Sequence, residues 1–130
     1  MIFLDSDVCI HFLNGKDTNL IKRFQANSPA DIKIASIVQA ELLFGVANSK
    51  KIRENGLKLT KFLEPYEILT FDSLAASIYA QIRFELSKKG NLIGPNDLIL
   101  AATVMANNGT LATRNIGEFK RLEKLNIEAW

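Results

Sequence analysis

Short runs of apolar residues alternate along this chain with longer segments whose apolar residues recur at helical spacing. A short apolar run predicts a strand, whereas apolar positions three and four residues apart predict an amphipathic helix. The predicted strands are Ile2–Leu4, Ile32–Ala35, Tyr66–Thr70, Thr110–Thr113 and Ile127–Trp130. Strands that alternate with helices form parallel sheets covered on both faces, so we expect one α/β domain with about four to five parallel strands.

The residues that begin and end helices refine this pattern. Asp5 or Ser6 is expected to cap a first helix that runs to about Leu13 and stops at Gly15. Ser36 and Gln39 have the spacing of a capping box, which predicts that Ser36 caps the helix that follows the strand Ile32–Ala35. The other predicted helices start at Asp17 or Thr18, cover about 48–63, run from Asp72 or Ser73 to about Lys89, from Leu98 to Asn108, and from about Glu118 to Leu125.

The composition fits a soluble globular domain. The chain has 130 residues, 48% of them hydrophobic and 23% charged, which suffices for a core without disulfides. Its single cysteine, Cys9, is expected in that core and suits a reducing compartment. No signal peptide is evident, and no apolar run approaches the roughly 20 residues that span a bilayer. We therefore expect a cytoplasmic protein over residues 1–130 with no membrane contact.

Charge alone does not identify a nucleic-acid partner, because the net charge is only +2. Basic residues nevertheless gather in two places. The two groups are Lys50, Lys51, Arg53, Lys58 and Lys61, and then Arg114, Lys120, Arg121 and Lys124. Either group could contact phosphates, although lysine-rich helix faces are more commonly only solvated.

Three acids occupy positions that bear on chemistry. Asp5 directly follows a strand, Asp97 opens a helix after a Gly-Pro turn, and Glu41 lies among apolar residues in a helix. Taken singly, Asp5 and Asp97 can be helix caps, and Glu41 can lie on the polar edge of its helix. Taken together, acids at strand ends and helix starts can converge above one edge of the sheet, where ligands bind in open α/β folds.

A cluster of carboxylates repels itself unless a divalent cation neutralises it. Hard oxygen ligands favour Mg²⁺ or Mn²⁺ over Zn²⁺. The only histidine, His11, has no second histidine or cysteine pair with which to form a zinc site, and we expect it to be a partly buried helix residue. The sequence contains no serine- or cysteine-nucleophile motif, no Walker loop and no dinucleotide fingerprint. Metal-assisted chemistry is therefore the remaining candidate for a catalytic mechanism.

Several segments along the chain carry a series of motifs. They are Ile2–Asp7, Ala40–Gly45, Ile93–Ala102, Leu111–Asn115 followed by Glu118 and Phe119, and Ile127–Trp130. In this order they resemble the motifs of the PIN-domain ribonucleases, and within them those of the VapC-like toxins of VapBC toxin–antitoxin systems. One such motif would be weak evidence, but the series follows the family's order and covers nearly the whole chain.

The resemblance implies roles for particular residues. It makes Asp5, Glu41 and Asp97 the catalytic, metal-binding acids. Asn115 departs from the family, since many PIN domains have a fourth aspartate there. Its amide oxygen can still ligate a metal or hold the metal's water, but it supplies no negative charge, and Glu118 could compensate indirectly. Five further residues are expected to contact the substrate or to support the metal ligands: Ser6, Asp7, Thr113, Arg114 and Asn115. Among them, Arg114 is a candidate for binding phosphate.

The resemblance also implies an activity and partners. We expect an Mg²⁺- or Mn²⁺-dependent endoribonuclease toxin, with tRNA as a candidate substrate, that leaves 5′-phosphate and 3′-hydroxyl ends. A metal-bound water would attack the phosphodiester, with Asp97 or Glu41 taking its proton. The family further implies a homodimer and a cognate VapB-like antitoxin.

Two other interpretations remain open at this stage. Asp5-Ser6-Asp7 after an apolar strand also resembles the opening of haloacid-dehalogenase-like phosphatases, although no late acidic pair follows Thr110–Thr113. Alternatively, the chain is a degenerate PIN scaffold that binds RNA or a partner without cleavage, which Asn115 favours and the three retained acids disfavour.

Overall fold

A five-stranded, fully parallel sheet organises the computed structural model, which describes all residues from Met1 to Trp130. The spatial order of the strands is β3-β2-β1-β4-β5. They comprise β1 (Ile2–Leu4), β2 (Ile32–Ala35), β3 (Glu67–Leu69), β4 (Thr110–Thr113) and β5 (Asn126–Ala129). The predicted α/β class with a central parallel sheet is therefore confirmed.

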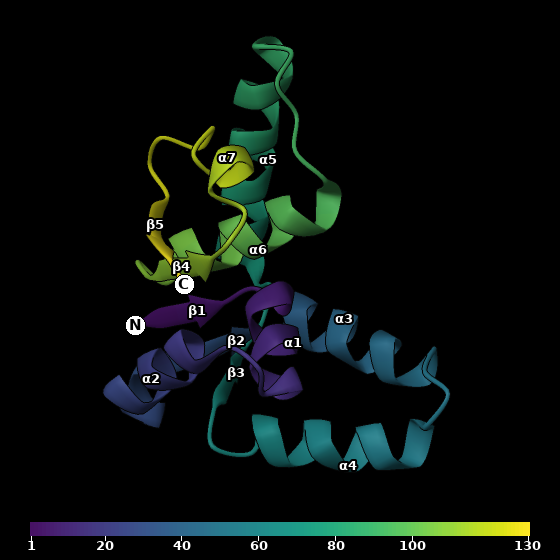
Figure 1. Cartoon of the computed structure of the whole chain (residues 1–130). Coiled ribbons are helices and arrows are strands. Elements are labelled where there is room, and N and C mark those ends of the chain that lie inside the picture. The colour runs from purple at the N-terminus through teal and green to yellow at the C-terminus, as the bar shows by residue number, and fades with distance from the viewer.

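Seven α-helices cover the two faces of this sheet. They are α1 (Ser6–Asn14), α2 (Thr18–Ala26), α3 (Ser36–Ala47), α4 (Ile52–Leu63), α5 (Ser73–Lys88), α6 (Pro95–Ala106) and α7 (Ile116–Phe119), with a short 3-10 helix at Pro29–Asp31. Figure 1 shows α1–α4 on one side of the sheet and α5–α7 on the other. This division follows from right-handed crossovers, because the chain steps from β1 to β2 to β3 and then returns to β4 and β5.

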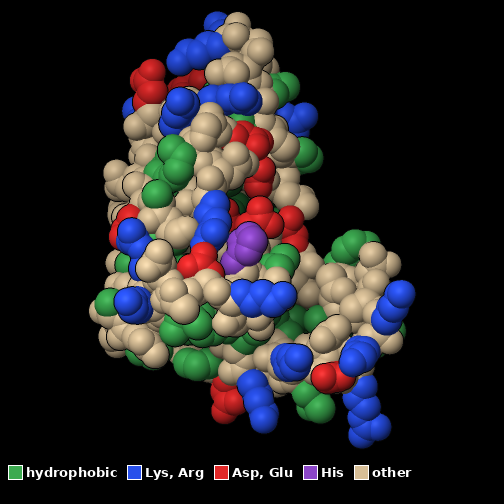
Figure 2. Space-filling view, viewed as in Figure 1, with side chains coloured by type: hydrophobic (Ala, Val, Ile, Leu, Met, Phe, Trp, Pro, Cys, Tyr) green, Lys and Arg blue, Asp and Glu red, His purple; other side chains and the backbone are tan.

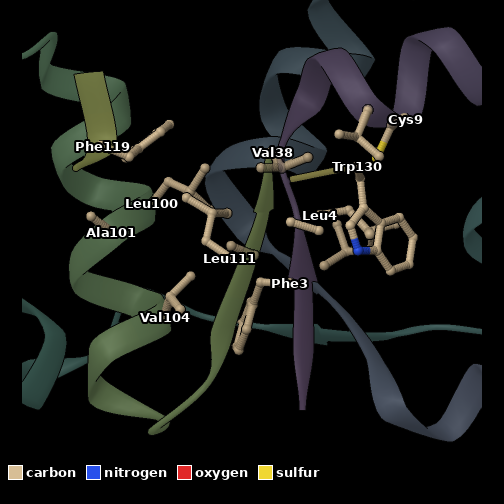
Figure 3. Close-up of a cluster of buried hydrophobic side chains, with 14 of the residues drawn as sticks. Phe3, Leu4, Cys9, Val38, Leu100, Ala101, Val104, Leu111, Phe119 and Trp130 are labelled. Carbon is tan, nitrogen blue, oxygen red and sulfur yellow. The ribbon is translucent and has the colours of Figure 1, made fainter. Parts of the chain in front are cut away.

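The core lies between the sheet and these helices. Leu100 and Val104 of α6 pack toward Leu111 of β4, and Phe3 and Leu4 of β1 are fully buried (Figure 3). Cys9 is also fully buried, as the sequence predicts. The strands are short apolar runs because residues of the inner strands are covered on both faces. The packed inner strands give the ends of β1 and β4 a fixed relative position.

Several predicted helix boundaries are confirmed. Asp5 is the cap of α1, and Asp17 and Asp72 cap α2 and α5, each side chain accepting a backbone N–H three residues on. Gly15 ends α1 in the left-handed conformation, with φ of 69°. Short polar residues at the starts of these helices therefore identify the first turns correctly.

Other predictions are wrong. The Ser36 capping box does not form, because α3 begins at Ser36 itself and no side chain caps it. The helix α6 begins at Pro95, whose fixed φ suits a first helical turn, so Asp97 lies inside the helix and is not its cap. His11 is exposed, contrary to the expectation of partial burial.

Two further helix boundaries differ from those that the sequence predicts. The basic helix α4 starts at Ile52, later than predicted, and α7 ends at Phe119 instead of reaching Leu125.

No helix in the structure combines the length and the apolar character needed to cross a membrane.

Candidate active site

Asp5 stands at the carboxyl end of β1, beside the end of β4. The chain leaves β1 toward the helices of one face and reaches β4 from the helices of the other, so the ends of these two neighbouring strands form the topological switch point of the sheet. The Asp5 backbone N–H donates to the carbonyl of Ala112, 3.2 Å away, which extends the β1–β4 pairing to the site. Asp5 therefore lies at the edge of the sheet where open α/β folds bind their ligands.

The Asp5 carboxylate is 7% exposed and is held by two donors. Its Oδ1 accepts the Val8 backbone N–H at 2.9 Å, and its Oδ2 accepts the hydroxyl of Thr113. Burial raises the pKa of Asp5, while these two hydrogen bonds lower it. The carboxylate is therefore both a helix cap and a buried acid at the site, so the two interpretations of Asp5 are compatible.

Glu41 reaches the same edge from α3. The side chain is half-buried, and burial raises its pKa, as does the negative charge of Asp5. Polar contacts with Asn96 and Ser6 act in the opposite direction. Glu41 is thus a poorly solvated acid, as expected from the apolar residues around it in the sequence.

Asp97 is the most strongly perturbed acid of the group. Burial raises its pKa to about 6, and the negative charges of Glu118 and then Glu41 contribute in the same direction. Asp5 adds a smaller effect of the same sign. The structure therefore brings Asp5, Glu41 and Asp97 close enough to repel one another.

Glu118 joins this cluster and is held in the ionised state. Its Oε2 accepts the Asn115 amide at 2.7 Å, and its Oε1 accepts the Gly94 backbone N–H at 3.2 Å. These hydrogen bonds lower the pKa of Glu118. Asn115, which the sequence singles out as an uncharged residue among the acids, thus orients the neighbouring Glu118 carboxylate.

The remaining predicted residues surround these acids in different ways. Thr113 accepts the Asn115 backbone N–H at 3.0 Å and donates to Asp5, so it links the two sides of the site. Ser6 is half-buried beside Glu41, whereas Asp7 is exposed and acts on Asp5 and Glu41 only through its charge. Arg114 forms an ion pair with Asp17.

Sequence reasoning missed three groups at this site. They are the Asn96 side chain, the Gly94 N–H and the carboxylate of Asp17. The turn before Asp97 gave a signal for the first two, since its residues must pass next to that acid. No local signal connects Asp17 with Arg114.

The donor set suits a hydrated hard cation. No group of three or more Asp, Glu, His or Cys side chains converges as a ready-made coordination cage. Mg²⁺ commonly keeps several waters and uses only one or two carboxylates, so a full cage is not required. Asp5, Glu41 and Asp97 offer oxygen ligands whose mutual repulsion a divalent cation would relieve.

Figure 2 shows acidic side chains gathered near the middle of one face, around the exposed single histidine. Basic side chains lie above and below this acidic zone in the same view. A negatively charged centre flanked by positive charge is suited to a cation that is bound first and a polyanion that is bound across it.

Comparison with known proteins identifies the family of this chain. The PIN domain family matches residues 2–125, and the chain belongs to that family. Within it, the chain is 40% identical to ribonuclease VapC2 of Rickettsia felis, over 98% of this chain and 96% of the relative. It is 32% identical to the tRNA(fMet)-specific endonuclease VapC of Salmonella typhimurium over the same shares.

Solved structures of VapBC complexes have the same fold. VapBC2 of Rickettsia felis bound to a promoter DNA fragment has a chain that superposes with a TM-score of 0.92, at 40% identity, covering 100% of this chain and 99% of that one. DNA-bound VapBC of Salmonella typhimurium gives a TM-score of 0.94 at 32% identity, covering 99% and 97%. The similarity is thus to VapC proteins over their whole length.

The repulsion at Asp97 predicts that Asp97→Asn stabilises the metal-free protein. An ionised acid whose folded-state pKa is raised destabilises the fold above that pKa, and this cost disappears as the pH falls below about 4. After allowance for solvent screening of a half-exposed group, we expect about 1 kcal/mol, or about 3 °C in Tm, at pH 7.5 in EDTA.

Thermal unfolding at pH 7.5 and pH 4 measures this effect. The exposed acid Glu123 supplies a matched control, because Glu123→Gln should leave Tm unchanged at both pH values. If the Asp97→Asn variant melts at or below the wild-type Tm at pH 7.5, the acids do not repel one another as described.

Proposed function

We propose that this chain is a divalent-metal-dependent endoribonuclease and the toxin of a VapBC-type pair. The observation that carries the proposal is the grouping of Asp5, Glu41 and Asp97 at the carboxyl end of β1, where the acids lie close enough to raise one another's pKa. Similarity to named VapC ribonucleases over 98% of the chain supports the same function. We further propose a single PIN domain over 1–130 that acts in the cytoplasm.

Asp5, Glu41 and Asp97 would hold Mg²⁺ or Mn²⁺. Such an ion, when bound, lowers the pKa of a coordinated water and stabilises the charge that develops on the phosphate. Thr113 and the Val8 N–H keep Asp5 in position for this role. Mg²⁺ and Mn²⁺ share these ligand preferences, so metal-dependence measurements decide between them.

Asp97 and Glu41 are the two candidates for proton transfer. In the metal-free protein, burial and the neighbouring negative charges raise the pKa of Asp97 to about 6, so this carboxylate accepts a proton more readily than an ordinary aspartate does. Glu41, whose pKa is also raised, is the second candidate for taking the proton of the attacking water. The products expected are a 5′-phosphate and a 3′-hydroxyl.

RNA is the proposed substrate, with tRNA as the first class to test. Two relatives of this chain carry the name tRNA(fMet)-specific endonuclease. The basic side chains of α4 and those that follow α7 are exposed, so a folded RNA larger than the site can place phosphates against them. Membership of the PIN family removes the phosphatase interpretation, and the degenerate scaffold becomes an outcome of the test below.

A VapB-like antitoxin is the proposed inhibitory partner. Ile10 and Glu41 line both of two adjoining hollows of about 320 Å³ and 400 Å³. The larger hollow also includes Phe44, 69% exposed, and the smaller one the apolar side chains of α1, α3 and α4. An apolar antitoxin segment in these hollows would cover Glu41 and so block the site.

We also propose that the chain forms a homodimer. Light scattering, which measures the molar mass in solution, tests this proposal.

Cleavage of unfractionated bacterial tRNA tests the enzymatic proposal. We expect cleavage with Mg²⁺ or Mn²⁺, none in EDTA, and a rate lower by roughly 100-fold or more in Asp97→Asn, because proton transfer and metal binding both depend on this carboxylate. Glu123→Gln serves as the control and should cleave at the wild-type rate. Cleavage that resists EDTA, or an unimpaired Asp97→Asn variant, contradicts the proposal, and binding without cleavage indicates the degenerate scaffold.

Phe44→Ser tests the antitoxin surface. Exposed aromatic anchors contribute strongly to protein interfaces, so we expect at least about tenfold weaker binding of a VapB-like antitoxin with tRNA cleavage retained. Phe84→Ser is the matched control, since Phe84 is 58% exposed on α5, on the other side of the sheet. Equal antitoxin affinity of the two variants in a pull-down or calorimetric titration would place the antitoxin elsewhere.

A further inference from the structure

Arg114, the first residue after β4, is anchored by a residue far away in the sequence. Its Nη2 donates to Oδ2 of Asp17, 97 positions earlier in the chain, and the two side chains are 37% and 30% exposed. The other carboxylate oxygen of Asp17 accepts the Leu20 backbone N–H at 3.0 Å as the cap of α2. Asp17 is therefore a fixed acceptor, and it gives the long Arg114 side chain a defined direction.

The position of Arg114 places this anchored cation next to the acids. Its neighbour Thr113 binds Asp5, and its other neighbour, Asn115, binds Glu118. The positive charge of Arg114 is close enough to lower the pKa of Asp5. Arg114 thus lies within the electrostatic reach of the site without being neutralised by the site's own carboxylates.

The pairing with Asp17 leaves donors available. A guanidinium group has five N–H donors in a rigid fork, and only one Nη2 contact to Asp17 is present among the hydrogen bonds of the Arg114 side chain. A phosphate that approaches a cluster of acids is repelled unless a cation is already in place. Ordering a flexible arginine in advance also reduces the entropy lost when the substrate binds.

We propose that Asp17 is a positioning residue, which holds the Arg114 guanidinium beside the candidate site so that its free N–H donors bind a phosphate of the RNA. This inference rests on the proposed ribonuclease function and deepens it. Arg114 contacts the substrate in this arrangement, whereas Asp17 acts only through Arg114.

A second ion pair in the chain provides a matched control. Arg23 of α2 donates to Glu128 of β5 at 3.1 Å, with side chains 47% and 45% exposed. Like the Asp17–Arg114 pair, it joins the α2 region to the C-terminal part of the chain, but it does so on the outermost strand. Removing the Arg23–Glu128 ion pair therefore measures the structural effect of losing a long-range ion pair of this kind.

The test compares Asp17→Asn with Glu128→Gln, since each removes the acid and leaves the arginine. Asparagine caps helices as well as aspartate does, so α2 keeps its cap, and Asp17→Ser provides a second capping variant. Affinity for fluorescently labelled unfractionated tRNA is measured by anisotropy in EDTA over a range of salt concentrations. Apparent KM and kcat are then measured with Mg²⁺.

We expect Asp17→Asn to weaken tRNA binding about threefold to tenfold and to raise KM while leaving kcat nearly unchanged. Arg114→Gln should weaken binding by about tenfold or more and reduce the slope of log affinity against log salt by about one phosphate contact. The double variant should bind no more weakly than Arg114→Gln, because Asp17 acts through Arg114. Glu128→Gln should bind and cleave as the wild type does.

Wild-type affinity in both Asp17 variants overturns the inference, and so does tighter binding, which would mean that Asp17 competes with phosphate. Additive losses in the double variant would equally contradict it. If the wild type binds tRNA without cleaving it, the proposed function fails while the binding data still decide the role of Asp17. If the wild type binds tRNA neither in EDTA nor with Mg²⁺, the inference about Asp17 is wrong, whereas the proposed function is decided separately by the cleavage assay.

Discussion

The hydrogen bonds of the buried Asp5 carboxylate are the constraint on which the rest of the site depends. A carboxylate that is 7% exposed must find donors inside the protein, and Asp5 finds them in the first turn of α1 and in Thr113 of β4. These two contacts join the strand that carries Asp5, the helix that follows it and the neighbouring strand. They thereby fix the edge of the sheet toward which Glu41 and Asp97 project from α3 and α6.

The same edge carries an electrostatic cost in the metal-free protein. Burial and neighbouring negative charge raise the pKa of Asp97 to about 6, while Asn115 and Gly94 keep Glu118 ionised beside it. Such repulsion is unfavourable for folding but favourable for binding a divalent cation, so the site exchanges stability for function. Arg114 lies at the border of this cluster, paired with Asp17, and so leaves the acids free.

The sequence predicts those parts of the structure that depend on neighbours in the chain. Buried parallel strands appear as apolar runs, and Asp5, Asp17 and Asp72 cap helices through contacts three residues away. The predicted Ser36 capping box does not form, because β2 leads straight into α3. Asp97 is not a helix cap, because Pro95, whose fixed φ suits a first helical turn, begins α6 two residues earlier. The pairing of Asp17 with Arg114 depends on tertiary folding across 97 positions, which no local pattern encodes.

Anomalous scattering from a crystal grown with Mn²⁺ tests most directly whether the acids at the carboxyl ends of β1 and β4 form a cation site. We expect one dominant anomalous peak at the carboxyl end of β1, with Asp5 and Asp97 oxygens at direct or water-bridged coordination distance. The Asp97→Asn variant should lose or greatly weaken this peak. A wild-type crystal with no peak at this edge, or with its dominant peak elsewhere on the protein, would contradict the account.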